Sequence, residues 1–594
     1  MMRQNLRAAL CLAILAATCH FAAAQTTSTT DAAPPAAPST VEPDSQAAPA
    51  PPSQAEPTPP TPDYLPSSLT YQIGVLLEDP AVARDHWGII VTNLDGGLIY
   101  GLNQAQLFQP ASNAKLFSTA MALALLGEDE RFETQVVAAG EIKKGVLHGD
   151  LKLVGGGDPS FGAQDLPYVP PAQRAKATPS VAPTTIADIE ELADKVYATG
   201  LRRIEGNVVG DDWQIIWDPY PPEWSLDDLV YGYGAPVSAL SVHDNEIKVT
   251  VSPGPQISPG NYAQGVIQTD PNMPYYTIKA QVSTDHAEGL PAPDCSLIGY
   301  QRAQGNKELN IYMPDRALEP DQAPCTQAVA IDDPAEYAAM AFKAALERRG
   351  VLVTGTAQAK HLLWRDPNPA TGVDDFVPST MAARLRFPYE RAAPREQCMA
   401  LSTSGGSDEF GQTVLATHES YPLSEDVTYT MKVSENLHAE VLLRDVGAAL
   451  SCAGTQRAAL NALRLFLPHT GIQQGDFVFV DGSGLSSHDL VTPRATAKLL
   501  QFATTQPWFA VWKASLPVGG EDGTLADRFT QPPLKGHVFA KTGTLGEARA
   551  LSGYLDAASG RTVIFSIMVD NHLPGTSADR DVMDKIVAAI QAAE

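Results

Sequence analysis

Hydrophobic patterning typical of folded structure runs through the chain except for its N-terminal portion. The apolar runs 87–93 and 98–100 flank an Asp-Gly-Gly turn, which predicts a β-hairpin. The run 112–126 is largely apolar and stops before a glycine, so it predicts a buried helix. Further along, 186–197 has the spacing of an amphipathic helix and 247–251 that of a strand. The pattern therefore predicts a mixture of helices and strands.

The N-terminus has the three parts of a secretory signal peptide. Arg3 and Arg7 form a basic region, residues 8–18 are apolar but too few to span a membrane, and the small residues 22–24 form a cleavage site. We expect the mature chain to be secreted across the inner membrane into the periplasm. A retained N-terminal anchor is the alternative.

A proline-rich stretch follows the predicted cleavage site. Residues 31–66 contain twelve prolines, with alanine, serine, threonine and glutamine in most other positions. Such a stretch has too few large apolar side chains to offset the entropy lost on folding. It predicts a disordered, extended linker over residues 25–66.

The charge of the chain narrows the classes of partner. Its 41 Lys+Arg residues against 68 Asp+Glu give a net charge of -27, which excludes a general nucleic-acid binder. Beyond the leader, no segment reaches the ~18 consecutive apolar residues of a membrane span. We therefore expect neither nucleic acid nor a stable membrane span, and the sequence leaves the oligomeric state open.

Four cysteines remain after the leader, an even number in a compartment that favours disulfides. Of the three possible connectivities, the most local pairs Cys295 with Cys325 and Cys398 with Cys452. Neither the cysteine spacing nor the scattered histidines fit a zinc pattern. We expect no cofactor and no catalytic metal.

The first candidate catalytic residues lie at the start of the predicted helix 112–126. Ser112 and Lys115 are three residues apart, so they share one helical face. A serine hydroxyl needs a nearby base to become a nucleophile, and a lysine with a lowered pKa can be that base. Alone the pair is a weak signal, because an ordinary helix-capping serine has the same pattern.

Two later triplets strengthen this signal. Ser434-Glu435-Asn436 opens an apolar helical run, where the serine can relay a proton and the amide can orient a lysine. Lys541-Thr542-Gly543, followed by Thr544, ends a strand-like run and offers positive charge, hydroxyls and a close backbone approach. The order of the three motifs, with these contexts, is a specific signal.

With these motifs the chain resembles the active-site serine penicillin-binding proteins and serine β-lactamases. It is most similar to the type-4, class-C penicillin-binding proteins, which are D-alanyl-D-alanine carboxypeptidases and endopeptidases. The runs 149–159, 206–211, 481–486 and 516–525 are also similar to segments of that family. The resemblance extends from about residue 70 to the end of the chain.

The resemblance implies an α+β fold, an α/β sandwich with an antiparallel sheet that is interrupted by two nested β-rich inserted domains. A long gap between Ser112 and Ser434 is typical of the type-4 group. The expected boundaries are as follows: signal peptide 1–24, linker 25–66, catalytic part 67–132, inserted domain II 133–155, inserted domain III 156–242, domain II again 243–384, catalytic part 385–594. The sheet should hold the N-terminal hairpin and strands near 538–542, 550–555 and 562–569, covered by a final helix near 578–593.

The resemblance also implies acyl transfer to water, with peptidoglycan stem peptides as substrates and β-lactam antibiotics as inhibitors. Ser112 is the implied nucleophile, and Lys115, held neutral by Lys541, the implied base. Ser434 would carry a proton to the leaving amine, and Asn436 would orient Lys115 and the substrate. The implied binders of the terminal carboxylate are Lys541, Thr542 and Thr544, with Gly543 between them, and the N–H groups of Ser112 and Thr544 form the oxyanion hole.

Some features depart from the family or stay open. Ser487 stands where the family commonly has an arginine, and the segment 360–420 is longer than expected. Asp244 is a candidate to bind the amine of a diaminopimelyl side chain, although a plain turn aspartate explains it too. A β-lactamase-like hydrolase and a non-catalytic wall-binding protein are the alternative functions.

Overall fold

The computed structural model describes residues 68–163, 165–174, 186–286, 293–303, 307–363, 412–451 and 454–594. The predicted signal peptide, the linker, most of the segment 360–420 and the predicted Cys398–Cys452 pair lie outside these ranges. No helix among the described residues combines the length and the apolar character needed to cross a bilayer.

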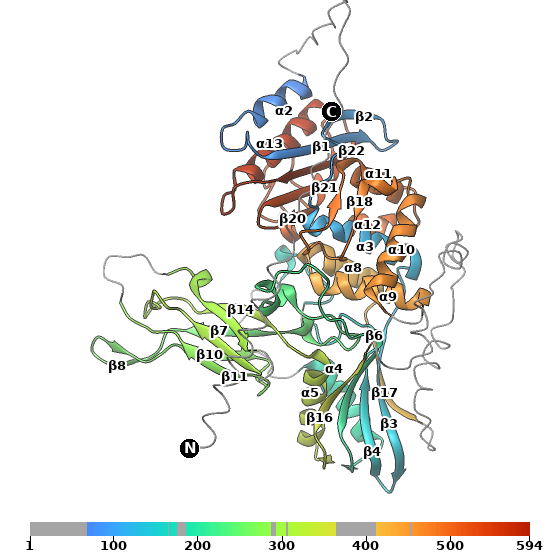
Figure 1. Cartoon of the computed structure of the whole chain (residues 1–594), viewed down its shortest axis with the longest axis vertical. Helices are drawn as coiled ribbons and strands as arrows, with labels where there is room; N and C mark the ends of the chain where they lie inside the picture. The colour runs from blue at the N-terminus through green and yellow to red at the C-terminus, as the bar shows by residue number, and fades with distance from the viewer. Residues whose placement is uncertain are drawn as a thin grey trace, which may run out of the picture. The chain divides into compact units, whose positions relative to one another are not determined.

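The catalytic sheet is antiparallel and five-stranded (Figure 1). Its strands, in spatial order, are β2 (Leu98–Leu102), β1 (His86–Asn93), β22 (Thr562–Asp570), β21 (Ala548–Asp556) and β20 (Val538–Thr544). The N-terminal hairpin thus pairs with strands from the end of the chain, and β1 runs beside β22 from the His86–Asp570 pair to the Asn93–Val563 pair. The predicted sheet and its antiparallel pairing are confirmed.

Helices cover both faces of this sheet because successive side chains of a strand point to opposite sides. Ile89 and Phe565 pack on α2 (Leu69–Leu77) and α13 (Ala578–Ala593). Ile90 and Ile564 face the second layer of helices. That layer comprises α3 (Ala114–Leu126), α8 (Leu423–Val433), α9 (Asn436–Ser451), α10 (Gln456–His469), α11 (Pro493–Ala503) and α12 (Phe509–Ser515), with the short pair β18 (Phe477–Val478) and β19 (Leu490–Val491). The sandwich matches the expected fold class.

A second, seven-stranded sheet is built mainly from the long insertion. Its strands are β3 (Glu133–Lys143), β4 (Val146–Val154), β5 (Arg203–Ile204), β6 (Val208–Ile216), β15 (Leu352–Val353), β16 (Ala357–Leu362) and β17 (Thr413–Glu419). The helices α4 (Ala187–Ala198) and α5 (Pro334–Arg348) pack their apolar faces on it. Strands β3 and β17 pair along the edge of the sheet from which the chain continues to α8.

Smaller sheets lie between β6 and α5 in the sequence. They comprise β7 (Glu246–Ser252), β10 (Val266–Asp270) and β14 (Cys325–Ala330); β11 (Thr277–Gln281), β12 (Gly299–Ala303) and β13 (Glu308–Tyr312); and the pair β8 (Gln256–Ser258) and β9 (Asn261–Tyr262). A disulfide joins Cys295 to Cys325, as predicted.

The pairing of strands can be compared with the domain boundaries expected from the sequence, which remain predictions. β5 and β6, which lie in the range 156–242, pair with β4 at the end of the range 133–155. These two ranges therefore share one sheet. The strands with a sheet of their own in the insertion are those from β7 to β14.

Candidate active site

Ser112 lies in a short 3-10 helix, Ala111–Asn113, that leads directly into α3. The turn is held tightly on both sides. A Cβ on Gly543 of β20 would come within 2.6 Å of the carbonyl oxygen of Pro110, and Asn113 donates a 2.8 Å hydrogen bond to Ser552 on β21. Ala111 has a φ of 46°, a conformation that L-residues rarely adopt. The close approach of β20 thus requires a glycine and fixes the position of Ser112.

Lys115 is fully buried one helical turn after Ser112. Its Nζ lies 3.0 Å from the Ser112 Oγ, 2.5 Å from the Asn436 Oδ1 and 2.7 Å from the carbonyl oxygen of Ser483. Burial lowers the pKa of Lys115 to about 8, although the negative charge of Asp481 acts in the opposite direction. A neutral amine can donate to the amide and carbonyl oxygens while its lone pair accepts the Ser112 proton.

Ser434 and Lys541 form a second pair. Ser434 ends α8 with left-handed backbone angles, φ 67° and ψ 38°, which turn the chain toward Asn436 at the start of α9. The buried Lys541 donates a 2.8 Å hydrogen bond to the Ser434 Oγ and one of 2.9 Å to the carbonyl oxygen of Thr542. Burial, and then the charge of Lys115, place the pKa of Lys541 well below its usual value. The expectation that Lys541 keeps Lys115 neutral needs revision, because burial is the main cause for both lysines.

Strand β20 places Thr542, Gly543 and Thr544 along one edge of the catalytic sheet. The Thr542 hydroxyl lies 2.7 Å from that of Thr524, and Thr544 is exposed. A side chain at position 543 would place its Cβ 3.2 Å from the backbone nitrogen of Ser112. The nucleophile and the predicted carboxylate binders therefore lie on adjoining segments.

Sequence reasoning missed the support behind Lys115. The carboxylate of Glu440, buried on α9, accepts 2.8 Å hydrogen bonds from the N–H groups of Gly482 and Ser483. This carboxylate also pairs with the buried Arg444 at 3.0 Å. The Ser483 carbonyl then faces Lys115. Only the run 481–486 carried a sequence signal, as a segment similar to the family with no role attached.

Asp481, at the start of that run, joins the insertion to the active site. Its Oδ1 accepts from the N–H of Gly484 at 2.7 Å, and its Oδ2 accepts from the indole N–H of Trp224 at 2.9 Å. The Nδ2 of Asn436 likewise donates to the carbonyl oxygen of Tyr233 at 2.8 Å. Residues of the insertion therefore contact Asp481 and the candidate catalytic residue Asn436 directly.

Asp244 lies beside the first turn of α9, where its partner is His438. Its Oδ1 is 3.1 Å from the Nε2 of His438, whose Nδ1 is 2.5 Å from the Oδ1 of Asp426. Burial alone would lower the pKa of His438, but the carboxylates of Asp426 and Asp244 raise it well above its usual value. Burial, and then the charges of Glu435 and Asp244, raise the pKa of Glu246 to about 8. An acidic cluster thus faces the first turn of α9.

Comparisons with known proteins identify the family of the chain. The model of the D-Ala-D-Ala carboxypeptidase 3 (S13) family matches residues 69–363 and 403–593. The chain is 30% identical over 521 residues to a D-alanyl-D-alanine carboxypeptidase of Actinomadura sp. (strain R39), covering 85% of this chain and 81% of that protein. It is 24% identical to the D-alanyl-D-alanine carboxypeptidase DacB of Haemophilus influenzae, covering 82% and 86%.

A solved structure shows the same fold. The crystal structure of penicillin binding protein 4 from Haemophilus influenzae superposes with a TM-score of 0.64 at 20% sequence identity, and the match covers 87% of this chain and 97% of that one. The fold and the family model therefore agree over most of the chain. The chain belongs to the D-Ala-D-Ala carboxypeptidase 3 (S13) family and is a serine-type D-Ala-D-Ala carboxypeptidase.

Proposed function

We propose that the chain cleaves D-alanyl-D-alanine peptides through an acyl-enzyme on Ser112, and that it also opens peptide cross-links as an endopeptidase. The observation that carries this proposal is the 3.0 Å contact between the Ser112 Oγ and the buried Nζ of Lys115. A lysine with a pKa of about 8 has a substantial neutral fraction near pH 7 to 8, so it can accept a proton. The proposed nucleophile, the Ser112 Oγ, and the proposed base, the Lys115 Nζ, are thus within hydrogen-bonding distance of each other.

In acylation the Ser112 Oγ bonds to the carbonyl carbon of the penultimate D-alanine, and its proton passes to Lys115. The oxygen of the tetrahedral intermediate accepts from the N–H groups of Ser112 and Thr544. The C–N bond then breaks, and the leaving amine takes the proton that Lys115 accepted, relayed through the hydroxyl of Ser434, which is hydrogen-bonded to Lys541. The terminal D-alanine leaves, and the acyl group stays on Ser112.

In deacylation a water molecule attacks the ester carbon and gives a proton to Lys115. The bond between this carbon and the Ser112 Oγ then breaks, and Lys115 regains its neutral form as its proton passes to the Oγ. Endopeptidase action uses the same steps, but the leaving amine belongs to the side chain of a neighbouring stem peptide. We assign the hydroxyls of Thr542 and Thr544, with the amine of Lys541 beside them, to the binding of a substrate carboxylate, whose negative charge would favour the protonated form of this lysine.

The first prediction concerns labelling by a β-lactam, whose strained amide mimics the scissile bond. We expect fluorescent penicillin to label the purified wild type stably, and the Ser112→Ala variant to remain unlabelled because it lacks the nucleophilic oxygen. Gel fluorescence measures both. Absence of label on the wild type contradicts the proposal, and rapid loss of label favours a β-lactamase-like hydrolase instead.

The second prediction concerns Asp244, which we propose as a contributor to the recognition of a substrate amine. The acidic cluster of Asp244, Glu246 and Glu435 beside Asn436 supports this role. We expect Asp244→Asn to lower kcat/KM about tenfold, or ~1.4 kcal/mol, for a peptide with a free side-chain amine. For the matched peptide with an acetylated amine, the same substitution should lower kcat/KM only slightly. An equal loss for both peptides assigns Asp244 to the support of His438 alone.

We also propose that the chain works in the periplasm, because its N-terminus has the pattern of a signal peptide. Peptidoglycan stem peptides are the substrates present there. Digestion of purified muropeptides, with products separated by mass, measures the ratio of carboxypeptidase to endopeptidase action.

A further inference from the structure

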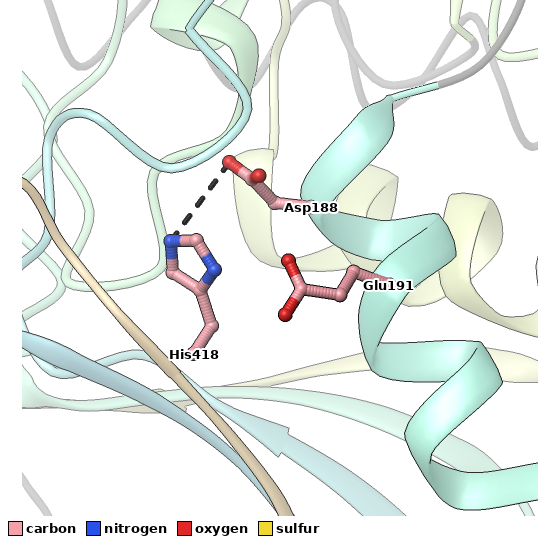
Figure 2. Close-up of side chains that lie close together, drawn as sticks. All are labelled: Asp188, Glu191 and His418. Atoms are coloured by element: carbon pink, nitrogen blue, oxygen red, sulfur yellow. Dashed lines mark ion pairs between the residues drawn. The ribbon is translucent and has the colours of Figure 1, made fainter.

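A group of metal-ligating side chains lies in the inserted part of the chain (Figure 2). Asp188 and Glu191 are three residues apart on α4, so both point from one face of the helix toward His418 on β17. One ligand atom from each of the three lies within 4.8 Å of the others. The His418 Nε2 is 3.9 Å from the Oδ2 of Asp188.

A third carboxylate, that of the buried Asp158, lies near the same imidazole. Asp158 is 1% exposed, and its Oδ1 accepts hydrogen bonds from the N–H and the hydroxyl of Ser160 at 2.8 and 2.6 Å. Its Oδ2 is buried and accepts no hydrogen bond from the described residues. This oxygen lies 3.9 Å from the His418 Nε2. A buried carboxylate oxygen without a donor is costly, and a bound cation would offset this cost.

We propose that Asp158, Asp188, Glu191 and His418 bind one Zn²⁺ ion. Zinc takes imidazole nitrogen at about 2.0–2.1 Å and carboxylate oxygen at about 2.0–2.2 Å, usually with four ligands. The His418 Nε2 lies 3.9 Å from the Oδ2 atoms of both Asp158 and Asp188. Small side-chain rotations would place a zinc ion between these atoms at the bond lengths given above. Magnesium and calcium prefer oxygen-only ligand sets, so the imidazole favours zinc over both.

Two neighbouring donors already contact these carboxylates. Lys195 lies 2.7 Å from the Oε1 of Glu191 and donates to the carbonyl oxygen of Thr417 at 2.8 Å. The N–H of Gly162 donates to the Oδ2 of Asp188 at 2.7 Å. A carboxylate oxygen can accept one N–H and still ligate a metal, because it has a second lone pair. Lys195, in contrast, competes with the ion for Glu191.

The site would fasten α4 to β17, next to the point where the chain returns to the catalytic domain. His418 pairs with Thr134 of β3, and Ser420, two residues later, is bonded to the N–H of Phe132 at 2.9 Å. β3 and β17 are thus the strands that enter and leave the insertion. A bound ion stabilises this junction and takes no part in the chemistry at Ser112.

The test uses the mature chain without an affinity tag, stripped with a chelator and titrated with ZnCl₂ by calorimetry and equilibrium dialysis. We expect one ion per chain, at least about tenfold weaker binding for His418→Gln and Asp158→Asn, and tighter binding for Lys195→Met. The matched control is His148→Gln on β4 of the same sheet, whose imidazole pairs with Glu205 at 2.9 Å and should not affect binding.

Stable labelling of each variant by fluorescent penicillin reports that the catalytic domain is folded. Because Asp158 and His418 are largely buried, Glu191→Gln provides an exposed second variant, which should also weaken zinc binding. Absence of zinc binding by the wild type overturns the proposal. Equal affinity of the wild type, His418→Gln and Glu191→Gln overturns it as well, because the ion would then lie elsewhere.

Discussion

Replacing Lys115 by methionine lowers the rate of acylation of Ser112 by up to about 10⁴-fold, the upper end of the range for general-base catalysis. The thioether side chain fills a similar volume but has no lone pair of comparable basicity for the Ser112 proton. It also removes the hydrogen bonds to Asn436 and Ser483. Stopped-flow measurement of acylation by a chromogenic β-lactam gives the rate constant.

The pH profile separates loss of the base from general damage. Neutral lysine is the active form, so the wild-type acylation rate rises with pH and levels off above about 8, the pKa of Lys115. The methionine variant should show no such rise. Lys498→Met, which alters an exposed lysine bonded to Gln501, is the matched control and keeps the wild-type profile. A sigmoidal rise that persists in the Lys115 variant assigns the base to another group.

The second large effect is expected at Glu440. Truncation to alanine leaves the buried guanidinium of Arg444 without its carboxylate and removes the acceptor for the N–H groups of Gly482 and Ser483. Breaking a buried pair in this way costs about 3–5 kcal/mol of unfolding free energy. The Ser483 carbonyl also loses its fixed position against Lys115, so acylation slows as well.

Urea unfolding, followed by fluorescence and by the fraction that fluorescent penicillin still labels, measures this loss. Glu440→Gln keeps an oxygen that can accept both N–H groups and should lose less stability than the alanine variant. Glu347→Ala is the matched control, because Glu347 forms a pair of the same i,i+4 spacing with Lys343 at the surface. Surface pairs contribute about 0–1 kcal/mol. Similar losses for the Glu440 and Glu347 alanine variants would contradict the role assigned to Glu440.

The candidate catalytic residues could be found in the sequence because each lies in a short local motif. Ser112 and Lys115 are one helical turn apart, and Ser434 and Asn436 flank a helix junction, so their relation depends on few dihedral angles. The family resemblance likewise located β20, β21 and β22 close to their observed bounds. Local sequence patterns and the order of motifs in the family were sufficient to locate these residues and strands.

The remaining contacts join residues far apart in the chain. Glu440 looks like any polar residue of an amphipathic helix until Gly482 and Ser483 are seen to need an acceptor. His418 and Asp158 are separated by most of the insertion, and the pairing of β17 with β3, and of β3 with β4, brings them together. Single-sequence reasoning has no access to such pairings, because register and packing are decided by the whole chain.

The hydrogen bond from Asn436 to the carbonyl of Tyr233 has an evolutionary and practical consequence. This hydrogen bond and the one from the indole of Trp224 to Asp481 make the insertion a structural component of the proposed catalytic centre. The insertion nevertheless contributes neither the proposed nucleophile nor the proposed base. A truncated enzyme that retains only the sandwich would need new partners for both groups. The insertion and the sandwich are therefore expected to exchange between relatives only as a matched set.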